Sequence, residues 1–164
     1  MTRCDPSLRC LHRVGALVMI SLGLFGTGCQ SPLTVTVPHI ERFQLSNPDA
    51  SPLEIDRALS ERAEIYARTR PYTQVWHGHG LSMEPLLPPE AWIVSETLPF
   101  EQLERGQVVL FNRSPGHRVA HALLKKTGQG WITVGVNNER VDHYTRVTRR
   151  NYLGVITAAF VADR

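Results

Sequence analysis

From residue 75 onward, apolar and polar positions alternate in short runs that are typical of β-strands separated by turns. A "TGQG" segment between two of these runs predicts a hairpin with a glycine-containing loop. Many short strands with frequent turns indicate a mainly β fold, and we expect a compact antiparallel barrel or sandwich. The runs interpreted as strands are residues 91–98, 106–113, 117–126, 131–136 and 152–161.

One helix is expected before this region. Ser51, Pro52 and Glu54 fit a capping box with proline at the first helical position, so we expect a helix from there to about Arg68. Arginines and acidic residues interleave along it, which favours packing against a core over lying on a membrane surface. Its expected apolar stripe consists of Leu53, Ile55, Leu59, Ala63 and Tyr66.

The first 28 residues have the pattern of a bacterial export signal. Arginines precede an uncharged stretch, residues 14–28, which is shorter than the roughly 20 apolar residues that span a membrane. The small residues before Cys29 resemble a lipobox, although Gly26 stands where leucine is usual. We therefore expect a lipid on Cys29 that anchors the chain in the bacterial cell envelope, facing the periplasm or the exterior. The alternative is an uncleaved signal anchor.

Charge and cysteine content narrow the function class. All three cysteines, Cys4, Cys10 and Cys29, lie in this N-terminal region, so the rest of the chain has no internal disulfide. Cleavage would remove three arginines and one aspartate, which lowers the net charge from +3 to +1. No basic patch remains that would argue for a nucleic-acid partner.

The predicted organisation has three parts. Residues 1–28 are the lipoprotein signal peptide. Residues 29–74 are a proline-punctuated tether, containing the strand-like "LTVTV", followed by the helix. Residues 75–164 are the β domain, and the exported chain is long enough for one domain with a real core.

The stretch "HGHGLSMEP", residues 77–85, presents a single serine hydroxyl on bent and rigid backbone. Gly78 and Gly80 allow close approach of a substrate, and the prolines that follow stiffen the turn. A serine becomes a nucleophile where a base takes its proton and N–H groups stabilise the oxyanion. His117 and His121 are four residues apart, so both point to one face of a strand.

Five segments, in this order, resemble the signal peptidase I family and the related LexA-type serine autopeptidases, in the branch that uses a histidine base. "GLSMEP" is similar to the nucleophile motif of that family. The later segments are "LERGQVVLF", "RVAHALLKK", "TVGVNNERVD" and "YLGVI". The resemblance covers about residues 75–160 and implies a mainly β fold with serine peptidase activity.

The resemblance also implies site residues. Ser82 would be the nucleophile, with its N–H in the oxyanion hole and with Gly80, Met83 and Pro85 at the substrate or oxyanion site. Asp142 corresponds to the last acid of the family's "GDNN…D" box and would orient the histidine.

Two histidines compete for the role of base. The separations of His121 from Ser82 and from Gly135 fit the family spacing, so we prefer His121. His117 remains the alternative because "HRV" matches the histidine-type motif. The lysines of the same strand, Lys125 and Lys126, lie near the expected hairpin tip and are interpreted as solvated.

The sequence departs from the family pattern at three positions. Gly80 stands where some members have a second hydroxyl donor, Gln107 replaces an acid, and Val136 stands where the box has its first aspartate. These departures support an alternative function, a catalytically inactive lipoprotein that keeps the fold and binds peptides or a partner. Another alternative is an autopeptidase that cuts its own tether.

We predict no cofactor and no metal. His77 and His79 would share a strand face, but a zinc site needs a third ligand, such as His143, and no ligand motif is completed. They would line the substrate cleft or bind nothing. The expected partners are peptide or protein substrates, together with a membrane reached through the lipid on Cys29.

Overall fold

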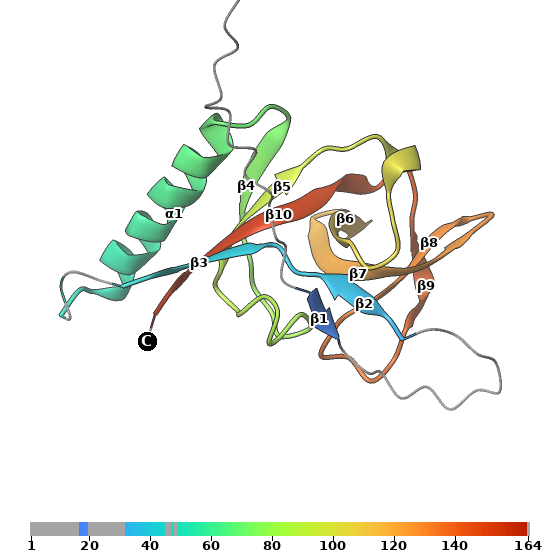
Figure 1. Cartoon of the computed structure of the whole chain (residues 1–164), viewed down its shortest axis with the longest axis horizontal. Coiled ribbons are helices and arrows are strands. Elements are labelled where there is room, and N and C mark those ends of the chain that lie inside the picture. The colour runs from blue at the N-terminus through green and yellow to red at the C-terminus, as the bar shows by residue number, and fades with distance from the viewer. Residues whose placement is uncertain (1–16, 20–31, 45–46, 48, 164) are drawn as a thin grey trace, which may run out of the picture.

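The computed structural model describes residues 17–19, 32–44, 47 and 49–163. Figure 1 shows one helix against an extensive sheet. The elements are β1 (Leu17–Met19), β2 (Thr34–Thr36), β3 (His39–Phe43), α1 (Pro52–Arg68), β4 (Thr73–His77), β5 (Trp92–Glu96), the short 3-10 helix η1 (Phe100–Gln102), β6 (Val108–Ser114), β7 (His117–Thr127), β8 (Gly130–Val134), β9 (Asp142–Val147) and β10 (Tyr152–Ala162).

The main sheet is open and mainly antiparallel. Its strand order is β4-β5-β10-β6-β7-β8-β9, and β3 adds a parallel pairing to the C-terminal half of β10. Within the described ranges no pairing joins β4 to β9, so the sheet does not close as the expected barrel would. The five strands expected from the alternating pattern all form, and β9 is an additional strand whose mixed sequence showed no clear alternation.

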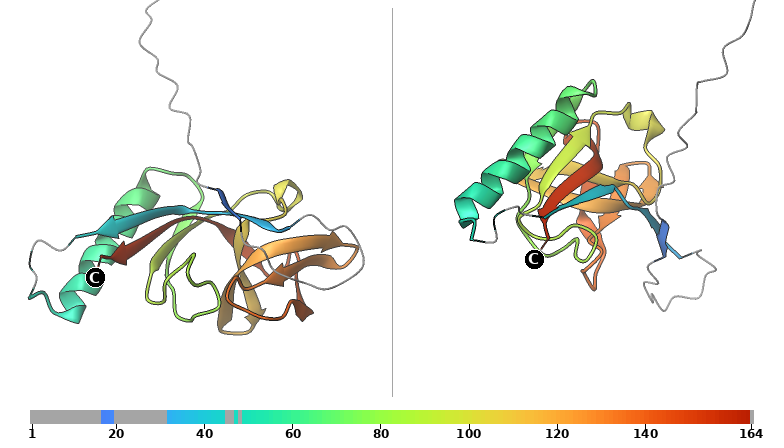
Figure 2. Two further views of the ribbon diagram at one scale, coloured as in Figure 1. Left: turned by 60° about the horizontal axis from the view of Figure 1, so that its bottom comes forward. Right: turned by 60° about the vertical axis from the view of Figure 1, so that its left-hand side comes forward.

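The capping box predicted for the helix is confirmed. The Ser51 side chain accepts a hydrogen bond from the Glu54 N–H, and the Glu54 carboxylate accepts one from the Ser51 N–H. Figure 2 shows α1 lying along one flank of the sheet, where it packs on β4, β5 and β10. The buried face consists of Leu59, Ala63 and Ala67, whereas Leu53, expected in the apolar stripe, is 77% exposed.

The segment predicted as a tether differs from that prediction. Leu33 and Val35 are buried in the core, and β3 lies beside β10 in the main sheet. Alternation in "LTVTV" therefore reflects a strand, β2, with one face against the domain. The prolines of the segment interrupt the strands, but the residues between them still pack on the domain or pair with its sheet.

Most of the predicted signal peptide, and Cys29 itself, lie outside the described residues. Leu17–Met19 is the exception, because these residues form β1 and pair antiparallel with β2. In the part of the chain that the structure describes, no helix is long and apolar enough to cross a membrane.

A substitution at Gly106 can test whether β2 packs against the rest of the domain. Its φ is +92°, and a Cβ there would lie 2.1 Å from the Thr34 carbonyl oxygen, while its own carbonyl accepts from the Thr36 N–H at 2.9 Å. Gly106→Ala should lower the free energy of unfolding by more than about 1 kcal/mol, because strain and a clash add. Urea unfolding measures this change. Gly116→Ala is the control, since its φ is +73° and nothing lies within 4 Å of its Cβ, so that substitution carries the strain without the clash; equal effects of the two substitutions would mean that β2 is not docked.

Candidate active site

Ser82 lies on the long connection between β4 and β5, and the core anchors that connection. Met83, Leu86 and Leu87 are each at most 6% exposed, so the core anchors the segment that follows Ser82. The Gly78 N–H donates a hydrogen bond to the Ala91 carbonyl at 2.8 Å, which joins the two ends of the connection. Gly80 adopts a φ of +119°, which residues with a Cβ rarely do. The result is a serine on a bent but well-anchored backbone.

The segment after β8 holds the Ser82 turn from the other side. Asn137 donates its N–H to the Ser82 carbonyl at 2.9 Å and its side-chain amide to the Leu81 carbonyl at 3.0 Å. A Cβ at Gly135 would lie 2.8 Å from the Ser82 carbonyl oxygen, so only glycine allows this approach without a shift. These contacts fix the turn relative to β7 and β9.

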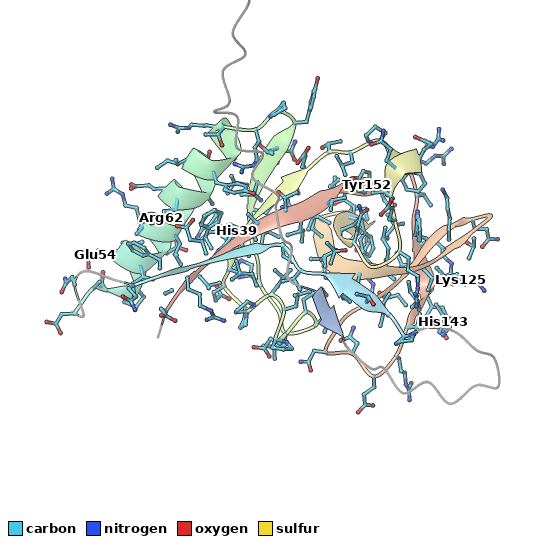
Figure 3. The ribbon with its side chains drawn as sticks, in the orientation of Figure 1. His39, Glu54, Arg62, Lys125, His143 and Tyr152 are labelled. Atoms are coloured by element: carbon cyan, nitrogen blue, oxygen red, sulfur yellow. The ribbon has the colours of Figure 1, made fainter. Side chains whose placement is uncertain are left out.

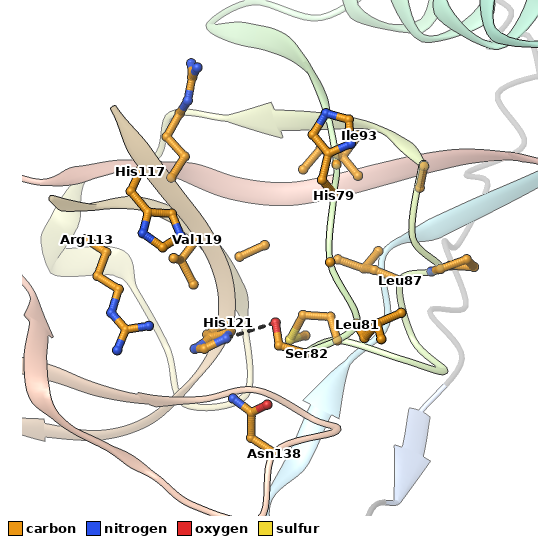
Figure 4. Close-up of a pocket in the computed structure, with 17 residues that line it drawn as sticks. His79, Leu81, Ser82, Leu87, Ile93, Arg113, His117, Val119, His121 and Asn138 are labelled. Carbon is orange, nitrogen blue, oxygen red and sulfur yellow. Dashed lines mark hydrogen bonds between the residues drawn. The ribbon is translucent and has the colours of Figure 1, made fainter. Parts of the chain in front are cut away.

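Ser82, His121 and Asp142 form a connected chain of side chains. Ser82 Oγ lies 3.1 Å from His121 Nε2, and His121 Nδ1 lies 2.5 Å from Asp142 Oδ2 (Figure 4 shows the first contact). An ionised carboxylate only accepts hydrogen bonds, so the Nδ1 atom carries a proton. The Nε2 atom of a neutral ring is then free to accept the proton of the Ser82 hydroxyl.

A second donor fixes the carboxylate. Thr133 on β8 pairs directly across from Asp142 on β9, and its hydroxyl donates to Asp142 Oδ2 at 2.8 Å. Thr133 is fully buried, the His121 residue is 3% exposed and the Asp142 side chain is 14% exposed, so these hydrogen bonds are largely shielded from water. Shielding strengthens each electrostatic contact within it.

The environment keeps Asp142 ionised. Burial alone would raise the pKa of Asp142, but hydrogen bonds from His121 and Thr133, with the charges of His121 and Arg113, lower that pKa below its ordinary range. An aspartate with a lowered pKa is negative at neutral pH, as an orienting group beside an imidazole must be.

The lowered pKa of Asp142 makes a prediction about stability. A carboxyl whose pKa is lower in the folded chain stabilises the fold above the unfolded value of about 3.9, and this contribution disappears as pH falls through the folded pKa. Wild type should therefore exceed Asp142→Asn in free energy of unfolding at pH 7. Urea unfolding from pH 7 down to pH 2 should show this difference shrinking below about pH 4. A difference that stays constant over the whole range would contradict the assignment.

A cleft of about 290 Å³ opens at the Ser82 hydroxyl. Figure 4 shows Arg113 and His117 on one side of it and the Ser82 turn, with His79, on the other. Leu87, Ile93 and Val119 add apolar surface. The cleft is large enough for a few residues of an extended peptide, and the serine lies at its wall.

The predicted alternatives for the base are separated by position. His117 begins β7 and is exposed on the cleft wall, and no hydrogen bond joins it to Ser82 among the described residues. Lys125 and Lys126 are exposed near the far end of the same strand, and neither is among the residues that line the cleft (Figure 3 labels Lys125). His121 alone of these four contacts the serine.

The other predicted site residues have different surroundings. Gly80 and Met83 line the cleft, although the Met83 side chain is 4% exposed and packs in the core. Pro85 is exposed and lies outside the residues that line the cleft. Val136 packs against the hydrophobic core, and Gln107 accepts a hydrogen bond from the Glu104 N–H in a turn. Among the described residues, neither of these two side chains has a hydrogen bond to His121.

Sequence reasoning missed several residues of the site. Thr133 was interpreted as part of a strand and of the box segment but had no assigned task, and its contact with Asp142 depends on strand register. Asn137 was part of a recognised box but had no assigned task, whereas it holds the Ser82 turn. Arg113 and Asn138 line the cleft; Asn138 was part of the same box without an assigned task, and Arg113 carried no local signal.

Comparisons with known proteins add no relative. No model of a known protein family matches the chain, no curated protein matches it, and no solved structure matches it.

Proposed function

We propose that this chain is a serine endopeptidase of the signal peptidase I type that cuts exported peptides or proteins. The observation that carries the proposal is the connected chain Ser82–His121–Asp142, with 3.1 Å and 2.5 Å between successive polar atoms, beside an open cleft. Nucleophile, base and orienting acid are recognised by such geometry rather than by sequence position. The finer fold assignment, to the signal peptidase and LexA type, belongs to the same proposal and is supported by the order of the five similar segments.

Acylation is the first half of the proposed reaction. Ser82 Oγ attacks the carbonyl carbon of the substrate while His121 Nε2 takes the hydroxyl proton. Asp142 stabilises the imidazolium that forms. The oxyanion accepts a hydrogen bond from the Ser82 N–H. In the part of the chain that the structure describes, this N–H donates to no other acceptor, so it is available to the oxyanion. The imidazolium then protonates the leaving amine as the C–N bond breaks, which leaves an ester on Ser82.

Deacylation returns the enzyme to its starting state. A water molecule enters where the amine has left, and His121 Nε2 removes its proton as the oxygen attacks the ester carbon. Collapse of the second tetrahedral intermediate returns the proton to Ser82 Oγ and releases a carboxylic acid. The same imidazole thus serves both halves, and no cofactor is required by the chemistry.

Val136 matters for the choice between an enzyme and a non-catalytic binding protein. The missing first aspartate of the box is one of the three departures that support that alternative. Here Asp142 reaches His121 directly and is itself held by Thr133, so one orienting carboxylate is present. A triad needs only one such group. We therefore favour the enzyme over a binding protein that has kept the fold.

Anchoring at the membrane is a separate part of the proposal. A lipid on Cys29 would hold the cleft near the membrane surface, where exported substrates emerge. We expect Cys29→Ser to lose the lipid modification and to shift the protein out of the membrane fraction, because one cysteine carries the anchor. Mass spectrometry of the wild-type N-terminus makes the measurement. Residues 1–28 still attached there would instead indicate a signal anchor.

The direct test of the proposed activity uses a fluorophosphonate probe, which phosphonylates activated serines with loss of fluoride. The full chain is incubated with the probe and digested, and the modified residue is mapped by mass spectrometry. We expect one modified site, Ser82, in the folded protein and none after denaturation. Modification of other serines only, or no modification of a folded sample, would contradict the proposal.

A further inference from the structure

A second cluster of ligand-type side chains lies where the Ser82 connection begins and ends. His77 closes β4 and His79 follows two residues later, whereas Glu90 lies just before β5 at the other end of the connection. Their donor atoms lie within 4.8 Å of one another. The sequence suggested His143 as a third ligand, but Figure 3 places His143 on the side of the molecule away from α1, outside this cluster.

The distances within the cluster suit a shared cation. Glu90 Oε1 lies 3.1 Å from His79 Nδ1, and Glu90 Oε2 lies 3.5 Å from His77 Nε2. Bonds of about 2.0–2.2 Å at a tetrahedral ion place neighbouring ligand atoms about 3.4 Å apart. Small rotations of the His79 and Glu90 side chains, which are 65% and 61% exposed, are enough to gather the three ligands.

One atom of the cluster lacks a hydrogen-bond partner. His77 Nε2 is buried, yet no described residue hydrogen-bonds to it. Its ring cannot turn away to water freely, because it stacks on Trp92 with 4.7 Å between ring centroids. A buried imidazole nitrogen that lies near carboxylates without a hydrogen bond is costly, and a metal ion would satisfy it.

Asp56 on α1 completes the surroundings. Its Oδ1 atom lies 3.6 Å from His77 Nε2 and accepts a hydrogen bond from Trp92 Nε1 at 2.8 Å. The indole therefore orients the carboxylate toward the cluster, as outer hydrogen bonds orient metal ligands in known sites. Asp56 is placed to be a fourth ligand or to hold a water in the fourth position.

We propose that His77, His79 and Glu90 bind a divalent transition-metal ion, with Asp56 beside the open position. Two imidazoles and a carboxylate are typical zinc ligands and select against magnesium or calcium, which prefer oxygen ligands alone. The site does not depend on the serine chemistry of the proposed function.

The position of the site gives it a structural consequence. Ligands from both ends of the Ser82 connection would be joined through one ion, which clips the connection at its base and ties it to α1 through Asp56. Metal clips that close a loop remove conformations from the unfolded chain. His79 also lines the cleft, so the bound ion would lie at the cleft rim. Metal binding should therefore stabilise the fold and steady the turn that carries Ser82.

The test measures Zn²⁺ binding directly by isothermal titration calorimetry. The full chain is used with its three cysteines replaced by serine, because thiols bind zinc themselves. We expect one ion per chain and a higher unfolding temperature with Zn²⁺, since a ligand that binds the folded state stabilises it. His79→Ala and Glu90→Gln should each weaken binding by about 100-fold or more and abolish the temperature shift.

Controls use the same residue types outside the cluster. His117→Ala and Glu139→Gln remove an exposed imidazole and an exposed carboxylate and should leave both readouts unchanged. Because His79 and Glu90 are exposed, their variants should fold, and circular dichroism checks this. No stoichiometric binding, or binding that all four variants share, overturns the proposal. Probe labelling of Ser82 measured on the same samples reports the peptidase proposal independently.

Discussion

His121→Ala is expected to lose covalent labelling of Ser82 by the fluorophosphonate probe almost completely. His121 Nε2 is the group that contacts the Ser82 hydroxyl, and the serine has no other base within reach among the described residues. Without a base the hydroxyl is a weak nucleophile, and loss of a serine or histidine in known serine proteases lowers kcat by about 10⁶-fold. The rate of labelling under excess probe gives the measurement, with Ser82→Ala as the baseline.

Matched variants on the same strand make this result specific. His117→Ala removes a histidine that lines the cleft without contacting Ser82, so we expect a mild effect on probe or substrate binding. Lys125→Ala should leave the labelling rate nearly unchanged, because that side chain is exposed and is not among the residues that line the cleft. If His117→Ala abolished labelling while His121→Ala retained it, the assignment of the base would be wrong and the enzyme assignment would survive.

Asp142→Asn should have the second largest effect, a fall of about 10⁴-fold in kcat, by analogy with the same change in a serine protease triad. Asp142 accepts the Nδ1–H of His121 at 2.5 Å, which keeps Nε2 free to act as the base. An asparagine amide can donate to Nδ1 and so place the ring proton on Nε2. That tautomer faces Ser82 with a donor and cannot accept the hydroxyl proton.

Two further variants separate this effect from simple destabilisation. Thr133→Val removes one donor to Asp142 and keeps the volume of the side chain, so we expect a much smaller loss of activity. Val136→Asp restores the family's box residue, but the native side chain packs on the core, and the change should cost stability without raising activity. Labelling rates measured alongside urea unfolding distinguish the outcomes. Full labelling by Asp142→Asn would favour a dyad in which the acid has no part.

Short-range patterns in the sequence determined much of this protein. The capping residues Ser51 and Glu54 define where α1 begins, because their hydrogen bonds span only three residues. Alternation of apolar residues predicted the strands that became β5, β6, β7, β8 and β10, since each buries one or both faces locally. Glycines around Ser82 and the prolines after it marked the turn, because their backbone preferences do not depend on distant contacts.

Strand register decided the rest of the candidate site. His117 and His121 share a face of β7, so alternation cannot choose between them, and the position of the Ser82 turn over the buried part of the strand does. Thr133 meets Asp142 because β8 and β9 pair at that point, which no spacing rule foretells. Local patterns likewise predicted a mainly antiparallel β fold but not how its sheet closes, since closing a sheet requires its edge strands to meet, and that is a property of the whole fold.

The N-terminal segment and the histidine cluster also show which features local sequence patterns determine and which depend on long-range packing. Proline-rich residues 30–50 read locally as a tether, yet β3 finds its partner in β10 at the other end of the chain. His77 and His79 were visible as a pair, but Glu90 joins them only because the connection folds back on itself, and Asp56 only because α1 packs there. Local propensity therefore determined the elements and the lone serine. Long-range packing decided which base, which acid and which ligands those elements bring together, because such contacts depend on residues far apart in the chain.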